Sequence, residues 1–394
     1  MKIGGLYMPR QKFWVNNTEA VLVIMSILII IGTINVFSAS FVLAGNQFHN
    51  PYYFLTRHLI SLAVGIIALV FTIKVDYRRW RGCVPLLFAF TLVALVLVLV
   101  IGVEVNGSKR WLNLVVMQFQ PSELAKLVSI LMAAAYLGPR IDKKLEIRVF
   151  TTPMFMLFVL SALIELQPDL GTAALVFGIP LILHVLAGLE WKWLGILTVP
   201  VVLIIIGLTI LQPYRLERIK AWIDPWPYQQ NQGYQTVQSM SAIGSGGFLG
   251  VGLGEGTGKY SYLPEAHTDF AFAIFCQENG YIGAIFLFFL LSILAFYGGK
   301  IANQAQDGFG KMIVSGVLIL IVGQSVANIA MVSGILPVVG VPLPFISYGG
   351  TSLIINMVGV GLLVNVGQYA AKHPKQATTE AAVPIRTRLR LVKK

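Results

Sequence analysis

Long apolar runs with almost no charge are the feature that most constrains the fold of this chain. Several runs approach the roughly 20 residues that a helix needs to cross a hydrocarbon core of about 30 Å. A backbone in lipid must satisfy its own hydrogen bonds, and the alternating pattern typical of a membrane barrel is absent. Only 12% of the 394 residues are charged and 56% are apolar. The sequence therefore predicts an all-α, polytopic integral membrane protein.

The apolar runs divide the chain into a membrane domain and two polar ends. We predict a cytoplasmic N-terminal segment at 1–18, a ten-helix membrane domain at 19–371, and a basic cytoplasmic tail at 372–394 that is too polar to fold. Hydrophobicity predicts about ten transmembrane helices within the membrane domain. Their expected ranges are 19–43, 57–73, 84–102, 121–138, 151–166, 170–188, 194–211, 270–297, 312–333 and 349–371.

The distribution of positive charge predicts the orientation in the membrane. With 29 lysines and arginines against 17 aspartates and glutamates, the formal net charge is +12. Basic residues gather in the N-terminal segment, in the loops 74–81 and 140–148, and in the tail. The positive-inside rule therefore places both termini in the cytoplasm. The same rule explains the charge without a nucleic-acid partner. The two cysteines, Cys83 and Cys276, offer no metal-site spacing.

Unusual polar sequence lies in the segments that this orientation places outside the cell. The loop 103–120 contains Lys109, Arg110 and Trp111. Just beyond it, Glu123 and Lys126 stand three residues apart and share one face of a predicted helix. Ionisable groups inside a span are costly and indicate a functional site by default. A lysine and an arginine together would suit an anion such as a pyrophosphate. A neutralising structural pair and interfacial anchoring are the alternatives.

The second polar region, 212–269, is predicted to be a large extracytoplasmic loop between the seventh and eighth transmembrane helices. It ends in His267, Thr268 and Asp269 at the mouth of the predicted helix 270–297. Asp269 is a candidate N-cap, which is a purely structural role. It is also a candidate carboxylate base, with a pKa tuned by partial burial beside the bilayer.

Three further stretches interrupt the apolar pattern. Gly244–Gly258 has the glycine density of an anion-binding backbone, although a flexible loop is favoured and the Walker pattern is not matched. Residues 277–280 place polar side chains in the eighth apolar run, so that either the helix begins outside the membrane or they face a cavity. Residues 334–350 are apolar yet rich in proline and glycine, which predicts broken backbone at membrane depth.

Five stretches together resemble the SEDS proteins (shape, elongation, division and sporulation), a family typified by FtsW, RodA and SpoVE. The stretches span nearly the whole membrane domain, and they occur in the order and at the topological positions of that family. They are Lys-Arg-Trp at 109–111, Gln-Pro-Ser-Glu-Leu-Ala-Lys at 120–126, Gln-Pro-Asp-Leu-Gly-Thr at 167–172, Pro-Glu-Ala-His-Thr-Asp-Phe at 264–270 and Pro-Leu-Pro-Phe-Ile-Ser-Tyr-Gly-Gly at 342–350.

This resemblance implies an enzyme of bacterial cell-wall synthesis. Family members polymerise lipid II, a disaccharide-pentapeptide on undecaprenyl pyrophosphate, into the β-1,4 glycan strands of peptidoglycan. They work with a class B penicillin-binding protein. The essential aspartate of the family maps onto Asp269, and its PSE-x-x-K element maps onto Glu123 and Lys126.

The resemblance also implies a subtype and a location. The stretch 264–267 is similar to the division type, FtsW, and to its sporulation relative SpoVE. A division enzyme would lie in the bacterial cytoplasmic membrane at the septum, with other divisome proteins and membrane lipids as partners and its active site facing outside. Candidate residues for binding the substrate or its pyrophosphate are Lys109, Arg110, Trp111, Glu123, Lys126, His267, Thr268, Ser347 and Tyr348.

Glycosyl transfer to a sugar hydroxyl assigns roles to some of these residues. Asp269 would act as the general base. Lys126 and Arg110 would stabilise the departing pyrophosphate, with Glu123 orienting Lys126. A divalent cation, Mg or Mn, is a candidate cofactor, although no ligand cluster beyond Asp269 and the outer acids supports it. Two other functions compete, namely a flippase that moves lipid II outward and an elongation-type polymerase similar to RodA.

Overall fold

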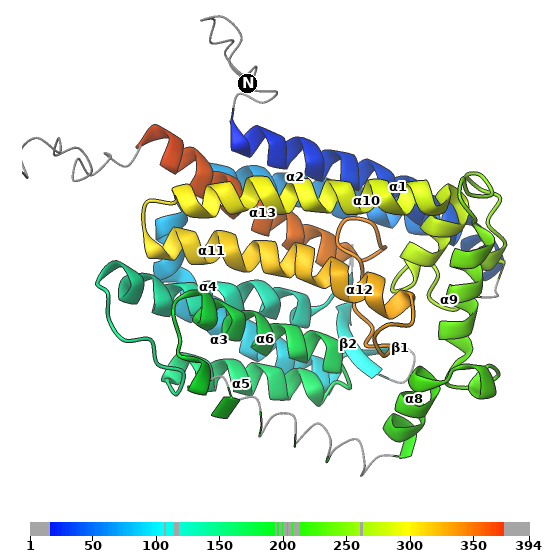
Figure 1. The fold of residues 1–394 in the computed structure, drawn as a ribbon, viewed down its shortest axis with the longest axis horizontal. Coiled ribbons are helices and arrows are strands. Elements are labelled where there is room, and N and C mark those ends of the chain that lie inside the picture. The colour runs from blue at the N-terminus through cyan, green and yellow to red at the C-terminus, as the bar shows by residue number, and fades with distance from the viewer. Residues whose placement is uncertain are drawn as a thin grey trace, which may run out of the picture.

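The computed structural model describes residues 16–373 except for 106–107, 114–117, 194, 197–198, 200–202, 204–206, 208–212 and 261–262. Within these residues the chain forms a bundle of long helices that lie side by side, with one small sheet at an end of the bundle (Figure 1).

Seven of the described helices are long and apolar enough to cross a membrane. They are α1 (Asn17–Phe48), α2 (Tyr53–Lys74), α3 (Tyr77–Ile101), α4 (Pro121–Asp142), α10 (Ala271–Gln304), the continuous helix formed by α11 (Gly308–Leu318), the π-helical segment η3 (Ile319–Gly323) and α12 (Gln324–Val332), and α13 (Gly350–Lys372). Two shorter apolar helices are α5 (Thr152–Glu165) and α6 (Leu170–Leu186).

These helices confirm the prediction of a polytopic helical membrane protein. They coincide with nine of the predicted ranges, whereas most of the predicted helix 194–211 lies outside the described residues. The exposed surface of the bundle is correspondingly apolar: Ile67 is 71% exposed and Leu86 is 73% exposed. Such a surface would be an aggregation hazard in water. In a bilayer it is the surface that contacts lipid.

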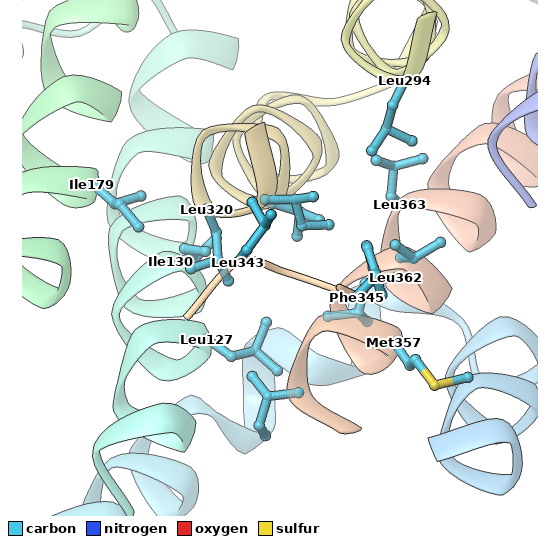
Figure 2. Packing of buried hydrophobic residues seen from close by; sticks show 14 of the residues in the cluster. Leu127, Ile130, Ile179, Leu294, Leu320, Leu343, Phe345, Met357, Leu362 and Leu363 are labelled. Carbon is cyan, nitrogen blue, oxygen red and sulfur yellow. The ribbon is translucent and has the colours of Figure 1, made fainter. Parts of the chain in front are cut away.

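The centre of the bundle is built around α4 and α13. α13 packs along α2, and α4 packs along α11. Figure 2 shows Ile130 of α4 close to Leu320, with Leu343 and Phe345 lying between the helices on the chain that precedes α13. That chain, 334–349, contains no helix, and it confirms the prediction of broken backbone at membrane depth.

This non-helical chain approaches α1 very closely. A Cβ atom at Gly32 would overlap the backbone carbonyl of Phe345. The glycine therefore permits a contact that any other residue would push apart. This contact seats the segment 342–349 inside the bundle, beside the loop that ends in Asp269.

The segments predicted to lie outside the membrane gather at one end of the bundle. In Figure 1 they lie at the right, opposite the start of α1 and the end of α13. The loop 103–120 forms a three-stranded antiparallel sheet in the order β1-β2-β3, which adds a small β element to the all-α prediction. The strands and loop helices here are β1 (Val103–Val105), β2 (Ser108–Asn113), β3 (Gln118–Phe119), α8 (Pro213–Ile223), η1 (Trp226–Tyr228), α9 (Tyr234–Ser245) and η2 (Thr257–Lys259).

α10 is broken at Gly280, where the backbone has φ 65° and ψ −166°. A break in a helix leaves carbonyls and amides without helical partners. The glycine-dense stretch supplies those partners, so it is a fixed structural element and not the flexible loop that was favoured. The four bonds run from Val251 N to Gln277 O (3.0 Å), Gly252 N to Glu278 O (3.1 Å), Tyr281 N to Gly247 O (3.0 Å) and Ile282 N to Phe248 O (3.3 Å).

Candidate active site

Asp269 lies two residues before α10, at the end of the bundle that carries the sheet and the loop helices. The N-cap of α10 is Phe270, and no side chain caps this helix, so the structural role considered for Asp269 is wrong. The Asp269 backbone carbonyl accepts a 2.7 Å hydrogen bond from Asn328 Nδ2. Within the described part of the chain, no hydrogen bond or ion pair reaches its carboxylate. The backbone is thus held in place while the carboxylate stays available.

The electrostatic surroundings of Asp269 favour a base that works near neutral pH. Burial, followed by repulsion from Glu265 and Asp169, raises the pKa of the Asp269 carboxyl from 3.8 to about 7, against the opposing charge of Arg110. Asp269 as a whole residue is partly exposed to solvent, whereas its carboxylate is surrounded by protein. A pKa near the working pH combines a usable ionised fraction with a useful proton affinity.

Arg110 and Asp169 approach Asp269 from two other elements. Arg110 projects from β2, and its Nε donates to the Gln167 carbonyl at 3.0 Å while its Nη2 donates to the Pro168 carbonyl. Asp169 is the N-cap of α6 and accepts from the Thr172 amide at 3.2 Å. The charges of Arg110 and Asp169 both affect the Asp269 carboxyl. The sequence analysis did not name Asp169 as a site residue, although it lies in the stretch 167–172 that carries part of the family resemblance.

Glu123 and Lys126 form a buried ion pair on α4, with the Lys126 Nζ 2.7 Å from Glu123 Oε1. Their side chains are 3% and 1% exposed. Lys126 also donates to Gln324 Oε1 at 3.0 Å, and the Gln324 Nε2 donates to the Pro342 carbonyl at 2.7 Å. The two charges therefore neutralise each other, as the alternative of a structural ion pair predicts. The Glu123 charge nevertheless affects the Asp269 carboxyl, so the pair borders the site as well.

Two buried amides on α12 connect these parts, and sequence reasoning missed both. Gln324 and Asn328 are one helical turn apart and fully buried. Besides bonding Asp269, the Asn328 Nδ2 donates to the Val341 carbonyl at 2.7 Å. Both amides follow the π-helical segment η3, a local irregularity that is frequent at functional sites. The available signal was a pair of amides four residues apart within an apolar span.

His267 and Tyr348 connect the loop before α10 to the loop before α13. The Tyr348 amide donates to the His267 carbonyl at 2.8 Å, and the two rings lie 5.6 Å apart. Phe54 of α2 packs on His267 at 4.5 Å. Burial lowers the pKa of His267, so its ring is neutral at pH 7.

Thr268 and Ser347 bond within their own loops. Thr268 Oγ1 donates to Glu265 Oε2 at 2.5 Å, and the Ser347 hydroxyl oxygen accepts from the Leu343 amide at 2.9 Å. These bonds shape the walls of the site. Substrate binding by either residue stays a prediction.

Lys109 and Trp111 lie in the sheet, opposite Glu104 and Val103 respectively. No described contact joins either side chain to Asp269. Among the residues that the structure describes, no group of three or more histidines, cysteines, aspartates or glutamates is arranged to hold a metal ion. Mg is often held by only one or two carboxylates together with substrate phosphates, so the cation stays a prediction.

Fold and site together define a class: a polytopic membrane protein with a carboxylate and cationic groups at the end of its bundle that carries the extramembrane loops. The match to known families is equally clear. The chain belongs to the FtsW, RodA and SpoVE family, described as "Cell cycle protein", whose model matches residues 18–372. The resemblance inferred from the five stretches is confirmed.

Individual relatives are similar over nearly their whole length. The chain is 40% identical to "Probable peptidoglycan glycosyltransferase FtsW" of Trichlorobacter lovleyi, covering 91% of this chain and 95% of that protein. It is 37% identical to "Stage V sporulation protein E" of Bacillus subtilis, covering 89% and 97%.

Solved structures show the same fold. One is described as "Structural coordination of polymerization and crosslinking by a peptidoglycan synthase complex". It superposes with a TM-score of 0.74 at 29% sequence identity, and the match covers 90% of this chain and 98% of that chain. Another is the rod shape determining protein RodA of Thermus thermophilus, with a TM-score of 0.65 at 27% identity and the same coverage.

Proposed function

We propose that this protein is a peptidoglycan glycosyltransferase that polymerises lipid II at the outer face of the bacterial cytoplasmic membrane. The observation that carries the proposal is the Asp269 carboxylate, which is fixed through its backbone yet has no bonding partner among the described residues. Family membership and relatives named as peptidoglycan glycosyltransferases support the same activity.

Asp269 acts on the acceptor sugar. Its carboxylate accepts the proton of the sugar 4-hydroxyl while the oxygen attacks the anomeric carbon of the donor. The bond from that carbon to the phosphate oxygen breaks as the new glycosidic bond forms. Displacement from the opposite face inverts the anomeric centre, so an α-linked donor yields a β-1,4 link. The proton rests on Asp269 until it passes to solvent.

The leaving pyrophosphate needs positive charge at the same site. Arg110 is suited to direct contact because a guanidinium has five N–H donors and its bonds to Gln167 and Pro168 use only Nε and Nη2. Lys126 is buried and already bonded to Glu123 and Gln324. We therefore assign Lys126 an electrostatic effect on the leaving group and Glu123 the orientation of Lys126.

The placement of buried charge favours this enzyme over a lipid II flippase. Among the described residues, the buried aspartate, glutamate and lysine side chains are Glu123, Lys126, Asp169, Lys259 and Glu278, and all belong to segments at the loop-bearing end of the bundle. A transport path would also place ionisable groups through the middle and the opposite half. That half of the described bundle adds one buried histidine, His184, whose ring Nδ1 bonds the Pro180 carbonyl of its own helix at 2.8 Å, and no chain of ionisable groups.

The relatives support a role in division. The protein would then act at the septum, together with a class B penicillin-binding protein that cross-links the product and with other divisome proteins. Relatives named FtsW and the sporulation protein favour this subtype over the elongation type. The match to a peptidoglycan synthase complex supports a partnered enzyme.

The direct test is polymerisation of purified lipid II by the protein and its penicillin-binding partner, with the transpeptidase serine of the partner inactivated. Asp269→Asn keeps the shape of the side chain but cannot accept the proton. We expect polymer from the wild type and a loss of about 10²–10⁴-fold in rate for the variant, the usual contribution of a general base.

Two results would contradict the proposal in different ways. Wild-type turnover by Asp269→Asn would remove this residue from the mechanism. Absence of polymer from a folded, correctly partnered wild-type complex would bring the flippase forward, to be tested by transport of lipid II across vesicles.

A further inference from the structure

A cavity lies outside the catalytic centre, within the large outer loop. It has a volume of about 350 Å³ and opens between α8, α9 and two loops of the Asp269 region. This volume falls within the range of about 300–1,000 Å³ typical of ligand sites. Its lining combines aromatic rings, amides and a guanidinium, which come from Arg218, Trp222, Asn231, Gln232, Tyr234 and Gln235. None of the candidate residues from the sequence lines it.

The cavity shares two loops with the catalytic centre. Pro264 and Val338 also line the cavity. Pro264 begins the stretch that ends in Asp269. Val338 is two residues from Gly340, where a Cβ atom would lie 3.4 Å from Asp269 Oδ2. The cavity and the catalytic centre therefore share the stretches 264–269 and 338–340.

The lining chemistry suits a saccharide better than a lipid tail. Aromatic rings such as Trp222 and Tyr234 offer flat surfaces with a polar edge for the faces of sugar rings. The amides of Asn231, Gln232 and Gln235 can each donate and accept, as hydroxyl and acetamido groups require. Within the described residues these three amide groups have no hydrogen-bond partner. They are therefore available to a ligand.

We propose that this cavity is a subsite for the glycan strand, where it binds amino-sugar units beyond the reacting sugar. The inference rests on the proposed polymerase function. A single disaccharide at Asp269 has no further sugar to occupy the cavity, whereas a strand does. Strand binding here keeps the polymer attached between additions, so the cavity controls the length of the product.

The test compares cavity variants with matched residues outside the cavity. Gln235→Ala removes a lining amide, and Gln230→Ala removes an exposed amide in the preceding turn that does not line the cavity. Trp222→Ala removes a lining ring, with the 61% exposed Trp226→Ala as its control. Since the Trp222 indole donates to the Ile335 carbonyl at 3.3 Å, Gln235→Ala is the variant less prone to misfolding.

Two readouts are taken on the full-length protein with its partner: strand length from lipid II, and binding of an unlipidated glycan oligomer. We expect both cavity variants to shorten the strands. We also expect Gln235→Ala to weaken oligomer binding by about threefold to tenfold, the worth of one neutral hydrogen bond. Both control variants should match the wild type.

The outcomes separate this inference from the proposed function. Unchanged strand length and oligomer binding in both cavity variants would overturn the subsite. Loss of binding to vesicles of anionic phospholipid, with oligomer binding intact, would also overturn it and identify a headgroup site. Oligomer binding that depends on Gln235, with no polymer from the wild type, would support the subsite while overturning the polymerase.

Discussion

At the residue scale, the chemistry depends on how one carboxylate differs from the others around it. Glu123 is neutralised by Lys126, and Asp169 caps α6. Glu265 accepts from the Thr268 hydroxyl. Asp269 alone among these four acids has no bonding partner in the described chain, and its pKa is raised to about 7. A general base needs that combination of availability and proton affinity.

The pH dependence of polymerisation follows from this pKa. The proposed mechanism needs the ionised Asp269 carboxylate, so the rate should rise with pH through a midpoint of about 7 and level off above it. At pH 6 about a tenth of the maximal rate should remain, as one pKa unit predicts. Initial rates of lipid II polymerisation between about pH 5.5 and 9 measure this.

Glu265→Gln gives the matched comparison for the pH profile. The Glu265 charge raises the pKa of Asp269, so its removal should move the midpoint to lower pH and keep the base ionised further into acid. A rate that is flat from pH 5.5 to 8, or a midpoint that moves upward in Glu265→Gln, would be inconsistent with Asp269 as the base.

At the element scale, the broken helix α10 depends on the outer loop that fills its break. A buried ion pair reinforces that junction: the Lys259 Nζ lies 3.2 Å from Glu278 Oε1, with side chains 5% and 1% exposed. Ser38 of α1 donates to the same Glu278 oxygen at 2.6 Å, and Lys259 also donates to the Gly254 carbonyl. Loop, α10 and α1 thus meet at a single carboxylate.

Glu278→Ala should destabilise the protein strongly because it leaves the Lys259 charge buried without compensation. We expect a loss of about 3–5 kcal/mol, the usual cost of breaking a buried pair from one side. The double variant Lys259→Met, Glu278→Leu should recover much of it, since no charge is then buried alone. Denaturant unfolding in detergent measures both.

The exposed pair of Arg148 and Glu146 provides the control for that experiment. These side chains are 69% and 66% exposed. Glu146→Ala should therefore change the stability far less than Glu278→Ala, because water screens an exposed pair. An equal loss of unfolding free energy in Glu146→Ala and Glu278→Ala would show that burial of the Lys259–Glu278 pair does not increase the cost of breaking it.

At the scale of the whole molecule, charge and apolar surface set how the bundle sits in lipid. The sheet and loop helices occupy one end, and the basic loops predicted to be cytoplasmic lie toward the other (Figure 1). The positive-inside rule then predicts that the Asp269 end faces outward. Lipid II polymerisation outside the cell requires this orientation.

Single cysteines in a Cys83→Ser background test the orientation. Glu104 in β1 and Arg79 in α3 are both exposed and lie at opposite ends of the bundle. A membrane-impermeant maleimide should label Glu104→Cys in intact cells and Arg79→Cys only after permeabilisation. Cys276 is buried and should stay unlabelled. The reverse labelling pattern would show that the protein has the opposite orientation, with Asp269 on the cytoplasmic side.

The sequence by itself determined the membrane class, nine of the helical ranges and the family. These depend on local properties: an apolar run of sufficient length must be a helix in lipid, whatever surrounds it. The sequence also identifies Asp269, Glu123 and Lys126 as candidates, because each lies in a contiguous motif or interrupts an apolar run.

Only the tertiary structure decided how those parts connect. Gln324 and Asn328 bond to Lys126, Pro342 and Asp269, which lie far from them in the sequence or on other elements, so nothing in the sequence identifies these partners. The glycine-dense stretch 244–258 has the composition of a flexible loop. Its hydrogen-bond partners lie at the break in α10, which is about 30 residues farther along the chain, so the sequence does not show that the stretch is fixed. Such partners are far apart along the chain. A buried polar group must be paired, but only the packed fold shows which distant group supplies the pair.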